Sequence, residues 1–281
     1  MASSKALAKV LRSPRGGISA AFLSVVIMCA VLAPWIAPYA YDIQNLPSAN
    51  NEPSLTHWLG TDEFGRDLLS RIIHGARTSL TVAVISIGVS VLVGTSLGAA
   101  AGYFGGAFDR AVTAVVDLTW SFPEILIALI FIAIIGPGLH STAIAISVAY
   151  LAQFTRLARA QIMALKGETY VEATINLGAT HAHILFRHLI PNAVTPIIVA
   201  AMLATGDAII LEATLGFFGL GAQPPTPSWG AMMSSGTATI FIAPWIIIFP
   251  GLAIATTVIA INLFGDEVIE SLDIRARLRD G

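Results

Sequence analysis

The stretch TSLTVAVISIGVSVLVGTSLGAAAGYFGGAF, residues 78–108, contains no charged side chain. A helix needs about 20 mostly apolar residues to cross the hydrocarbon of a bilayer, so this stretch is long enough to span a membrane. Other uncharged stretches cover residues 16–41, 125–155, 188–206 and 213–265. The sequence therefore predicts an all-α, polytopic membrane protein.

The overall composition leads to the same class. The 281 residues are 56% hydrophobic and 11% charged, with a mean hydropathy of +0.78, whereas soluble domains carry about 25% charged residues. The net charge of −2 argues against a nucleic-acid partner, and membrane lipid is the expected surrounding. The single cysteine, Cys29, excludes an intrachain disulfide framework and a cysteine-based metal site.

Six transmembrane helices are expected. The turn signal Gly136-Pro137-Gly138 divides the run 125–155, and the Gly- and Pro-rich stretch 215–230 precedes the last helix. The predicted helices cover residues 18–38, 79–102, 114–135, 141–160, 193–214 and 243–264. The first apolar run is too long for a signal peptide, so an uncleaved helix is expected there.

The distribution of Lys and Arg predicts the orientation, because these residues concentrate on the cytoplasmic side. Only Arg66, Arg71 and Arg77 lie on the opposite side. Both termini are therefore expected in the cytoplasm. The predicted organisation is a basic segment 1–17, a six-helix membrane domain 18–264 with outer loops 39–78 and 215–242, and a tail 265–281.

Glycines recur every fourth residue in the second predicted helix, at Gly94, Gly98 and Gly102. Such spacing lines one helix face with hydrogen atoms and lets another helix approach closely. Packing within the chain is the favoured interpretation, and a contact between subunits is the alternative.

Four carboxylates lie in or beside the predicted spans: Asp117, Glu124, Asp207 and Glu212. A charge at mid-bilayer costs at least about 2.5 kcal/mol, so each is expected to face protein or water. Asp207 and Glu212 are candidates for lining a translocation path and meeting a cationic group on a cargo. Hydrogen bonding to a neighbouring helix is the alternative.

Neither a metal site nor enzyme chemistry is visible in the sequence. His181, His183 and His188 lack the spacing that places ligands on one helix face, so solvated or interface histidines are expected. No phosphate-binding G-x-x-x-x-G-K-[ST] motif is present. The chain is therefore not expected to hydrolyse ATP or to act as an enzyme.

The polar segment 164–190 is the candidate functional element. Tyr170, Ala173, Leu177 and Ile184 recur at helical spacing, Gly178 offers a break, and Pro191 suits the first turn of a helix. The pattern predicts a short cytoplasmic helix, a break and a helix that enters the membrane. Such a segment either receives force from a partner or lies as an amphipathic helix on the membrane surface.

This segment resembles the EAA loop of ABC-transporter permeases, E-A-A-x3-G-x9-I-x-L-P. Glu172, Ala173, Gly178 and Pro191 fall at matching positions, whereas Thr174, His188 and Ile190 depart from the pattern. The H-x-x-P-N run at 188–192 resembles the version in dipeptide and oligopeptide permeases. Further stretches that resemble this subfamily lie at 57–80, 102–126, 212–233 and 262–279.

The resemblance implies the shorter, C-type permease subunit of a peptide importer, with a type I fold in the cytoplasmic membrane. It implies a homologous second permease, cytoplasmic ATPase subunits that bind ATP and Mg²⁺, an external or periplasmic peptide-binding protein, and no cofactor on this chain. The residues implied in coupling to the ATPase are Tyr170, Glu172, Ala173, Gly178, His181 and Pro191. The residues implied in an outer gate or binding-protein contact are Asp62, Arg66, Asp67, Pro224, Pro225 and Trp229.

Three alternatives remain. Importers of nickel or other small solutes have permeases with the same motifs. A stand-alone secondary transporter is expected to show inverted repeats and embedded coupling residues, of which no clear sign is found in the sequence. An intramembrane enzyme is opposed by the lack of a recognisable catalytic set.

Overall fold

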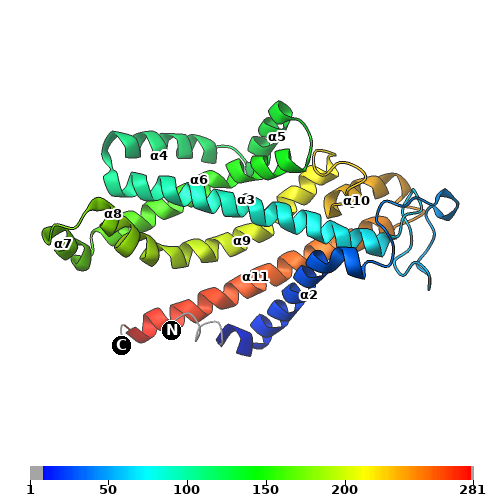
Figure 1. Ribbon diagram of the computed structural model, residues 1–281, viewed down its shortest axis with the longest axis horizontal. Helices are drawn as coiled ribbons and strands as arrows, with labels where there is room; N and C mark the ends of the chain where they lie inside the picture. Colours follow the sequence, from blue (N-terminus) through cyan, green and yellow to red (C-terminus); the bar gives the residue numbers. More distant parts are fainter. Residues whose placement is uncertain (1–8, 280–281) are drawn as a thin grey trace. The chain divides into compact units, whose positions relative to one another are not determined.

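The structure is a computed structural model that describes residues 9–279, with side chains described up to Ser271. This part of the chain is mostly helical and contains no β-strand, only an isolated bridge between Thr61 and Asp67. The helices, labelled as in Figure 1, are α2 (Pro14–Ile36), α3 (Leu68–Phe104), α4 (Gly106–Trp120), α5 (Glu124–Ile135), α6 (Leu139–Lys166), α7 (Thr169–Asn176), α8 (His181–His183), α9 (Ile190–Phe217), α10 (Trp229–Gly236) and α11 (Trp245–Arg279). Short 3-10 turns cover Leu46–Ser48 and Thr237–Thr239, and a π-helical turn at Ile184–Leu189 joins α8 to α9.

Four helices among the described residues are long and apolar enough to cross a membrane. They are Pro14–Ile36, Leu68–Phe104, His181–Phe217 and Trp245–Ser271, and the bent pair α4 and α5 raises the number to five if it counts as one span. Helix α6 is not among them, because it combines polar residues with Arg156 and Arg159. The six-span count and the cytoplasmic placement of both termini therefore stay predictions.

The prediction of one continuous helix over residues 114–135 is wrong. Helices α4 and α5 meet at 96°, and the break lies at Ser121, Phe122 and Pro123. Proline lacks the N–H that a helix needs and pushes the preceding residue out of the helical region. The Ser121 hydroxyl donates to the Asp117 carbonyl at 2.9 Å and closes the last turn of α4. A search for uncharged runs does not detect such a break.

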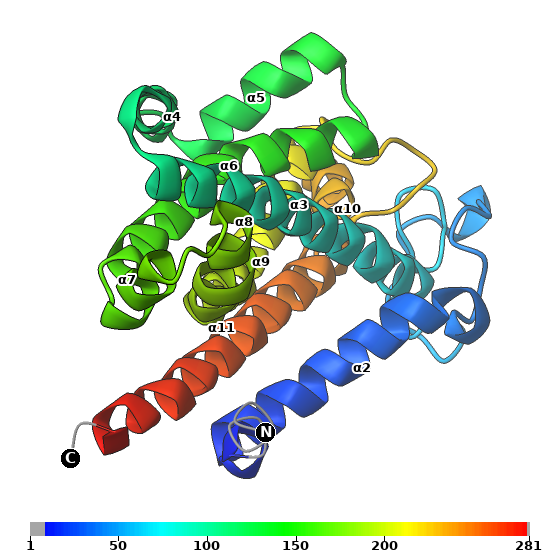
Figure 2. The same ribbon diagram turned by 60° about the vertical axis from the view of Figure 1, so that its left-hand side comes forward.

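The chain divides into two compact units. Unit 1 comprises Met1–Val84, Ile132–Ala143 and Met202–Gly281, and unit 2 comprises Ile85–Phe131 and Ile144–Ala201. In unit 1, α2 and α11 lie side by side (Figures 1 and 2) and α10 also packs on α11. Gly265 of α11 approaches α9 instead, because a Cβ there would lie 2.7 Å from a methyl carbon of Leu203.

Unit 2 is held together by the glycine face of α3. A Cβ added at Gly94 would lie 3.0 Å from the Leu151 carbonyl oxygen of α6. At Gly98 it would lie 2.2 Å from the Thr155 carbonyl oxygen. The favoured interpretation of this glycine spacing, packing within the chain, is confirmed.

Replacing Gly98 with alanine should destabilise the protein. The new methyl group would collide with the backbone of α6, and overpacking of this kind costs about 1–3 kcal/mol. We expect a lower thermal unfolding midpoint for Gly98→Ala in detergent.

Gly88→Ala is the matched control, since a Cβ at Gly88 meets nothing within 4 Å. That substitution should leave the midpoint unchanged or raise it, because alanine favours a helix more than glycine. Equal midpoints for the two variants would refute the tight packing of α3 on α6.

Candidate functional site

The segment between α6 and α9 contains the expected short helix and break. Helix α7 begins after Glu168 and ends near Leu177, where Gly178 adopts a φ of +81°. This left-handed conformation costs glycine little and strains other residues. Thr180 then caps α8 by accepting a hydrogen bond from the His183 N–H at 3.3 Å.

The predicted apolar stripe of this segment is not the face that packs on the chain. Val171 is the buried residue of α7, whereas Tyr170 is 40% exposed and Leu177 is 87% exposed. Ile184 is buried, but it lies beyond the turn at Gly178 and therefore does not share a face with α7. The turn interrupts the helical period on which the stripe was based. Helix α7 thus presents its exposed apolar side chains away from its own chain.

Polar contacts join this segment to the end of α3. The His181 ring nitrogen Nδ1 and the Tyr103 hydroxyl lie 2.8 Å apart, and Lys166 Nζ donates to the Tyr103 carbonyl at 2.7 Å. Nearby, Arg159 of α6 forms a two-point ion pair with Asp109 of α4, with its second bond at 2.7 Å. No sequence pattern had singled out Tyr103.

Pro191 and Asn192 form a local structure at the start of α9. Proline has no N–H to donate to the preceding turn, and the turn before it, Ile184–Leu189, is π-helical. The Asn192 amide donates to the His188 carbonyl at 2.6 Å and to the Tyr170 hydroxyl at 3.4 Å. The H-x-x-P-N run thus connects α9 with α7.

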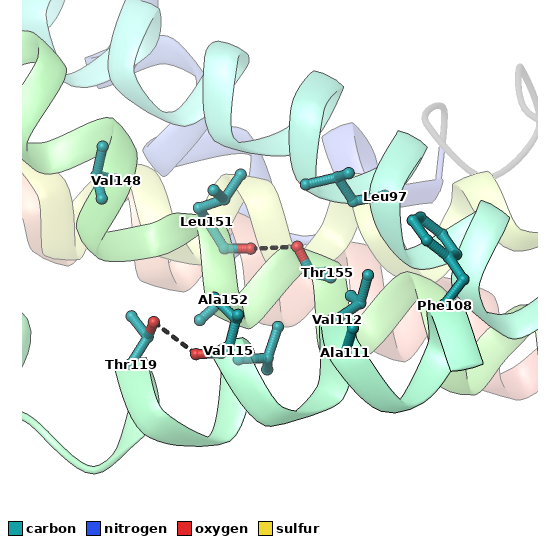
Figure 3. Close-up of a pocket in the computed structure, with 11 residues that line it drawn as sticks. Leu97, Phe108, Ala111, Val112, Val115, Thr119, Val148, Leu151, Ala152 and Thr155 are labelled. Atoms are coloured by element: carbon teal, nitrogen blue, oxygen red, sulfur yellow. Dashed lines mark hydrogen bonds between the residues drawn. The ribbon is translucent and has the colours of Figure 1, made fainter. Parts of the chain in front are cut away.

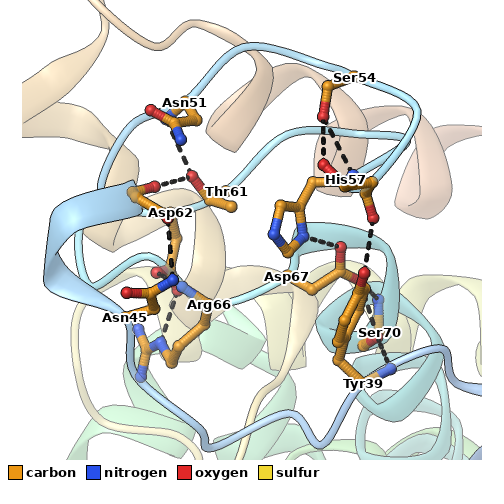
Figure 4. Close-up of polar contacts among 12 residues, drawn as sticks. Tyr39, Asn45, Asn51, Ser54, His57, Thr61, Asp62, Arg66, Asp67 and Ser70 are labelled. Atoms are coloured by element: carbon orange, nitrogen blue, oxygen red, sulfur yellow. Dashed lines mark hydrogen bonds and ion pairs between the residues drawn. The ribbon is translucent and has the colours of Figure 1, made fainter.

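The three predicted outer-loop residues Asp62, Arg66 and Asp67 are buried, with exposures of 1%, 5% and 4%. Figure 4 shows how they fix the loop. Asp62 accepts from Arg66 Nε at 2.6 Å and lies 3.3 Å from Arg71 Nε. Asp67 accepts from the Ser70 hydroxyl at 2.7 Å and pairs with His57 at 2.9 Å. These side chains shape the loop, and their contact with a binding protein stays a prediction.

The other predicted outer residues divide into two groups. Trp229 is 2% exposed, and its indole Nε1 donates to the Ile72 carbonyl at 3.0 Å. Pro224 and Pro225 are exposed. The prolines therefore lie on the surface, whereas Trp229 anchors α10 to α3.

The two candidate path carboxylates differ in their surroundings. Asp207 is exposed on α9. Glu212 is fully buried, and its carboxylate faces the hydroxyls of Ser79 and Ser228 without a hydrogen bond of normal geometry. Lining of a path by Glu212 would require the surrounding elements to separate, so this role stays a prediction for both residues.

An apolar cavity of about 360 Å³ lies in unit 2 between α3, α4 and α6 (Figure 3). Its two hydroxyl groups are occupied within their own helices: Thr119 donates to the Val115 carbonyl and Thr155 to the Leu151 carbonyl, both at 2.8 Å. The cavity therefore offers hydrocarbon surface and no free polar anchor. Among the described residues, no cluster of three or more His, Cys, Asp or Glu side chains could hold a metal ion.

The sequence matches two known families of transport proteins. Residues 94–278 match the family described as binding-protein-dependent transport system inner membrane component. Residues 4–53 match the N-terminal transmembrane domain of oligopeptide transport permease C. The chain belongs to the binding-protein-dependent transport permeases.

Relatives of this permease are similar over most of their length. Glutathione transport system permease proteins GsiD of Escherichia coli O6:K15:H31 (strain 536 / UPEC) and Shigella boydii serotype 4 (strain Sb227) are each 42% identical over 259 residues. The match covers 91% of this chain and 84% of each relative. The fold is similar to that of the inward-facing MetNI methionine ABC transporter, with a TM-score of 0.57 and 19% identity over 71% of this chain and 95% of that chain. The protein is thus a peptide-type permease subunit of an ABC importer, a multi-pass protein of the cytoplasmic membrane.

Removing the charge of Asp62 should loosen the outer loop. In Asp62→Asn, Arg66 and Arg71 lose a shared buried carboxylate, and breaking a buried pair in this way costs about 3–5 kcal/mol. We expect a lower thermal midpoint and faster proteolysis within residues 45–67. Glu52→Gln, an exposed substitution in the same loop, should behave as wild type. Equal proteolysis of the two variants would contradict the buried network.

Proposed function

We propose that this permease conducts di- and oligopeptides inward as one half of a two-permease pathway. The observation that carries the proposal is the 42% identity over 91% of the chain to permeases named for glutathione transport. Glutathione is itself a tripeptide, so cargo of this kind has peptide bonds and charged ends. Import of nickel or another small solute by the same architecture is the alternative, and a stand-alone secondary transporter is the less favoured one.

We further propose that segment 170–183 is the coupling element. Helix α7 has only one buried residue, Val171, while Tyr170, Ile175 and Leu177 expose apolar surface. Burial of apolar surface against a partner is favourable by about 25 cal/mol per Å². A groove in a cytoplasmic ATPase subunit suits this surface, and Glu172, also exposed, suits a charge-assisted hydrogen bond to it.

The contacts of His181 and Lys166 with Tyr103 support transmission into the helices. A push on α7 would reach the end of α3 through these short hydrogen bonds and α6 through Lys166. Under this proposal, ATP and Mg²⁺ bind to the ATPase subunits, an external peptide-binding protein delivers cargo, and a homologous permease completes the path. This chain needs no cofactor of its own.

The substrate proposal is tested with the complete importer in proteoliposomes. We expect ATP-dependent uptake of labelled di- to tetrapeptides and of glutathione. Uptake of a nickel chelate in place of peptides would refute the peptide proposal while leaving the ABC permease assignment intact.

The coupling proposal is tested with Leu177→Asp and Glu172→Lys. A charge at the 87% exposed Leu177 should leave the purified permease as stable as wild type. It should reduce uptake at least about 10-fold, because a buried unpaired charge at an interface costs well over 1.4 kcal/mol.

Leu55→Asp is the matched control, since Leu55 is a 97% exposed leucine in the outer loop. This variant should transport normally. Normal uptake by Leu177→Asp and Glu172→Lys would show instead that α7 is an ordinary surface helix.

A further inference from the structure

A second cavity, of about 450 Å³, lies in unit 1, and six of its nine lining residues carry a side chain that can donate a hydrogen bond. Its volume falls within the range of about 300–1,000 Å³ that small-ligand sites occupy. The polar lining comes from α3, from the loop after α2 and from the loop between α9 and α10: Tyr41, His74, Arg77, Thr78, Thr81 and Thr226. The apolar remainder includes Pro34 and Leu139.

Arg77 sets the charge of this cavity. Arg66 and Arg71 pair with Asp62, and Arg159 pairs with Asp109. Arg77 is an exposed arginine without an ion pair among the described residues, as are Arg12, Arg15, Arg110, Arg156 and Arg187. Within residues 9–271 the guanidinium of Arg77 forms no hydrogen bond or ion pair, and none of the described residues that line the cavity is an acid. An arginine is always charged and offers five donors in a planar fork that matches a carboxylate or phosphate.

The neutral donors around Arg77 complement this charge. Tyr41, Thr81 and Thr226 contribute hydroxyl groups, and none of these three hydroxyls forms a hydrogen bond within the described residues. His74 contributes a ring nitrogen. Asp42, the acid that follows Tyr41 in the chain, is exposed and does not line the cavity, whereas Arg77 does.

The wall of the cavity is held in place by the buried outer-loop network. Arg71, which Asp62 fixes, donates from Nη1 to the Tyr41 carbonyl at 3.0 Å. The Tyr41 ring in turn packs on the His74 ring, with 4.7 Å between the centroids. The Tyr41 and His74 side chains are therefore preorganised, which lowers the ordering cost of binding a ligand against them, whereas these contacts do not hold the exposed Arg77 side chain.

We propose that this cavity binds an oxyanion, with the Arg77 guanidinium as its principal anchor. Arg77 is the last charged residue before the uncharged run 78–108, which places it at the outer end of a span under the predicted orientation. Two sources supply an oxyanion there: the terminal carboxylate of a peptide cargo and the phosphate of a phospholipid headgroup. The cargo source rests on the proposed peptide transport, and the lipid source does not.

The cargo arm compares a labelled tripeptide bearing a free terminal carboxylate with the same peptide as its terminal amide. Uptake is measured with the complete importer. Because the binding protein has its own preference between the two peptides, each variant is compared with wild type by its change in KM for each peptide. Arg77→Gln should raise the KM for the free carboxylate about 10-fold and leave the KM for the amide unchanged, since a hydrogen bond between charged groups is lost. Arg77→Lys keeps the positive charge, so its KM for the free carboxylate should lie between those of wild type and Arg77→Gln.

The lipid arm uses the permease extracted from vesicles of phosphatidylcholine and phosphatidylglycerol. Mass spectrometry of the purified protein measures the retained phosphatidylglycerol. If the lipid phosphate is the ligand, wild type retains this lipid and Arg77→Gln loses it. Arg110→Gln, an exposed arginine of α4 outside the cavity, should match wild type in both arms.

The outcomes separate the site from the transport proposal. An effect of Arg77→Gln in one arm supports the oxyanion site and names its source. Absence of peptide uptake by wild type refutes the proposed function, and the lipid arm then decides the site alone. Two results overturn the proposal. The first is that Arg77→Gln matches wild type in every arm in which wild type takes up peptide or retains lipid. The second is that wild type neither takes up peptide nor retains phosphatidylglycerol.

Discussion

The close approach of α3 and α6 is the constraint on which unit 2 depends. With hydrogen atoms in place of side chains at Gly94, Gly98 and Gly102, the backbones of the two helices come into contact. That packing places Tyr103, at the end of α3, within reach of Lys166 at the end of α6. Because Tyr103 also bonds His181, the segment after α6 is tied to the same pair of helices. Helix α7 is therefore held at its base while its apolar side chains stay exposed.

A different interaction organises the loop before α3 in unit 1. The buried Asp62 carboxylate serves two arginines, and one of them extends to the backbone of Tyr41. Burying these charges is costly unless they are paired and hydrogen bonded, and here the pairing gives the loop a defined shape. The Trp229 and Trp245 indoles donate to backbone carbonyls at Ile72 and Thr61 and join the loop and α3 to α10 and α11. The shape of this loop is thus fixed by residues that are not themselves exposed.

Much of this organisation can be predicted from the sequence, and the failures have physical causes. Uncharged runs indicate helices well, but they do not reveal the break at Pro123, because a proline carries no charge and interrupts the helix through its backbone. Glycine spacing predicts the contact of α3 with α6, since the period of an α-helix fixes which residues share a face. The stripe through Tyr170, Leu177 and Ile184 fails because Gly178 changes the direction of the chain between them. The sequence motif identified Asp62 and Arg66 but not their burial, and Tyr103 was missed because its partners are distant in sequence.

If segment 170–183 couples the ATPase to the helices as proposed, α7 must move with α6 as one body when the importer cycles. The most direct measurement is the distance between spin labels at Asn176→Cys in α7 and Met163→Cys in α6, with Cys29 replaced by serine. Both side chains are exposed, and Asn176 does not belong to the apolar surface proposed to enter the ATPase groove, so labels fit without disturbing the packing. Motion as one body predicts the same distance distribution for the complete importer without nucleotide and with ATP and vanadate. A shift of more than one helical turn, about 5.4 Å, between these states would contradict it and would mean that α7 swings independently of the helices it is proposed to drive.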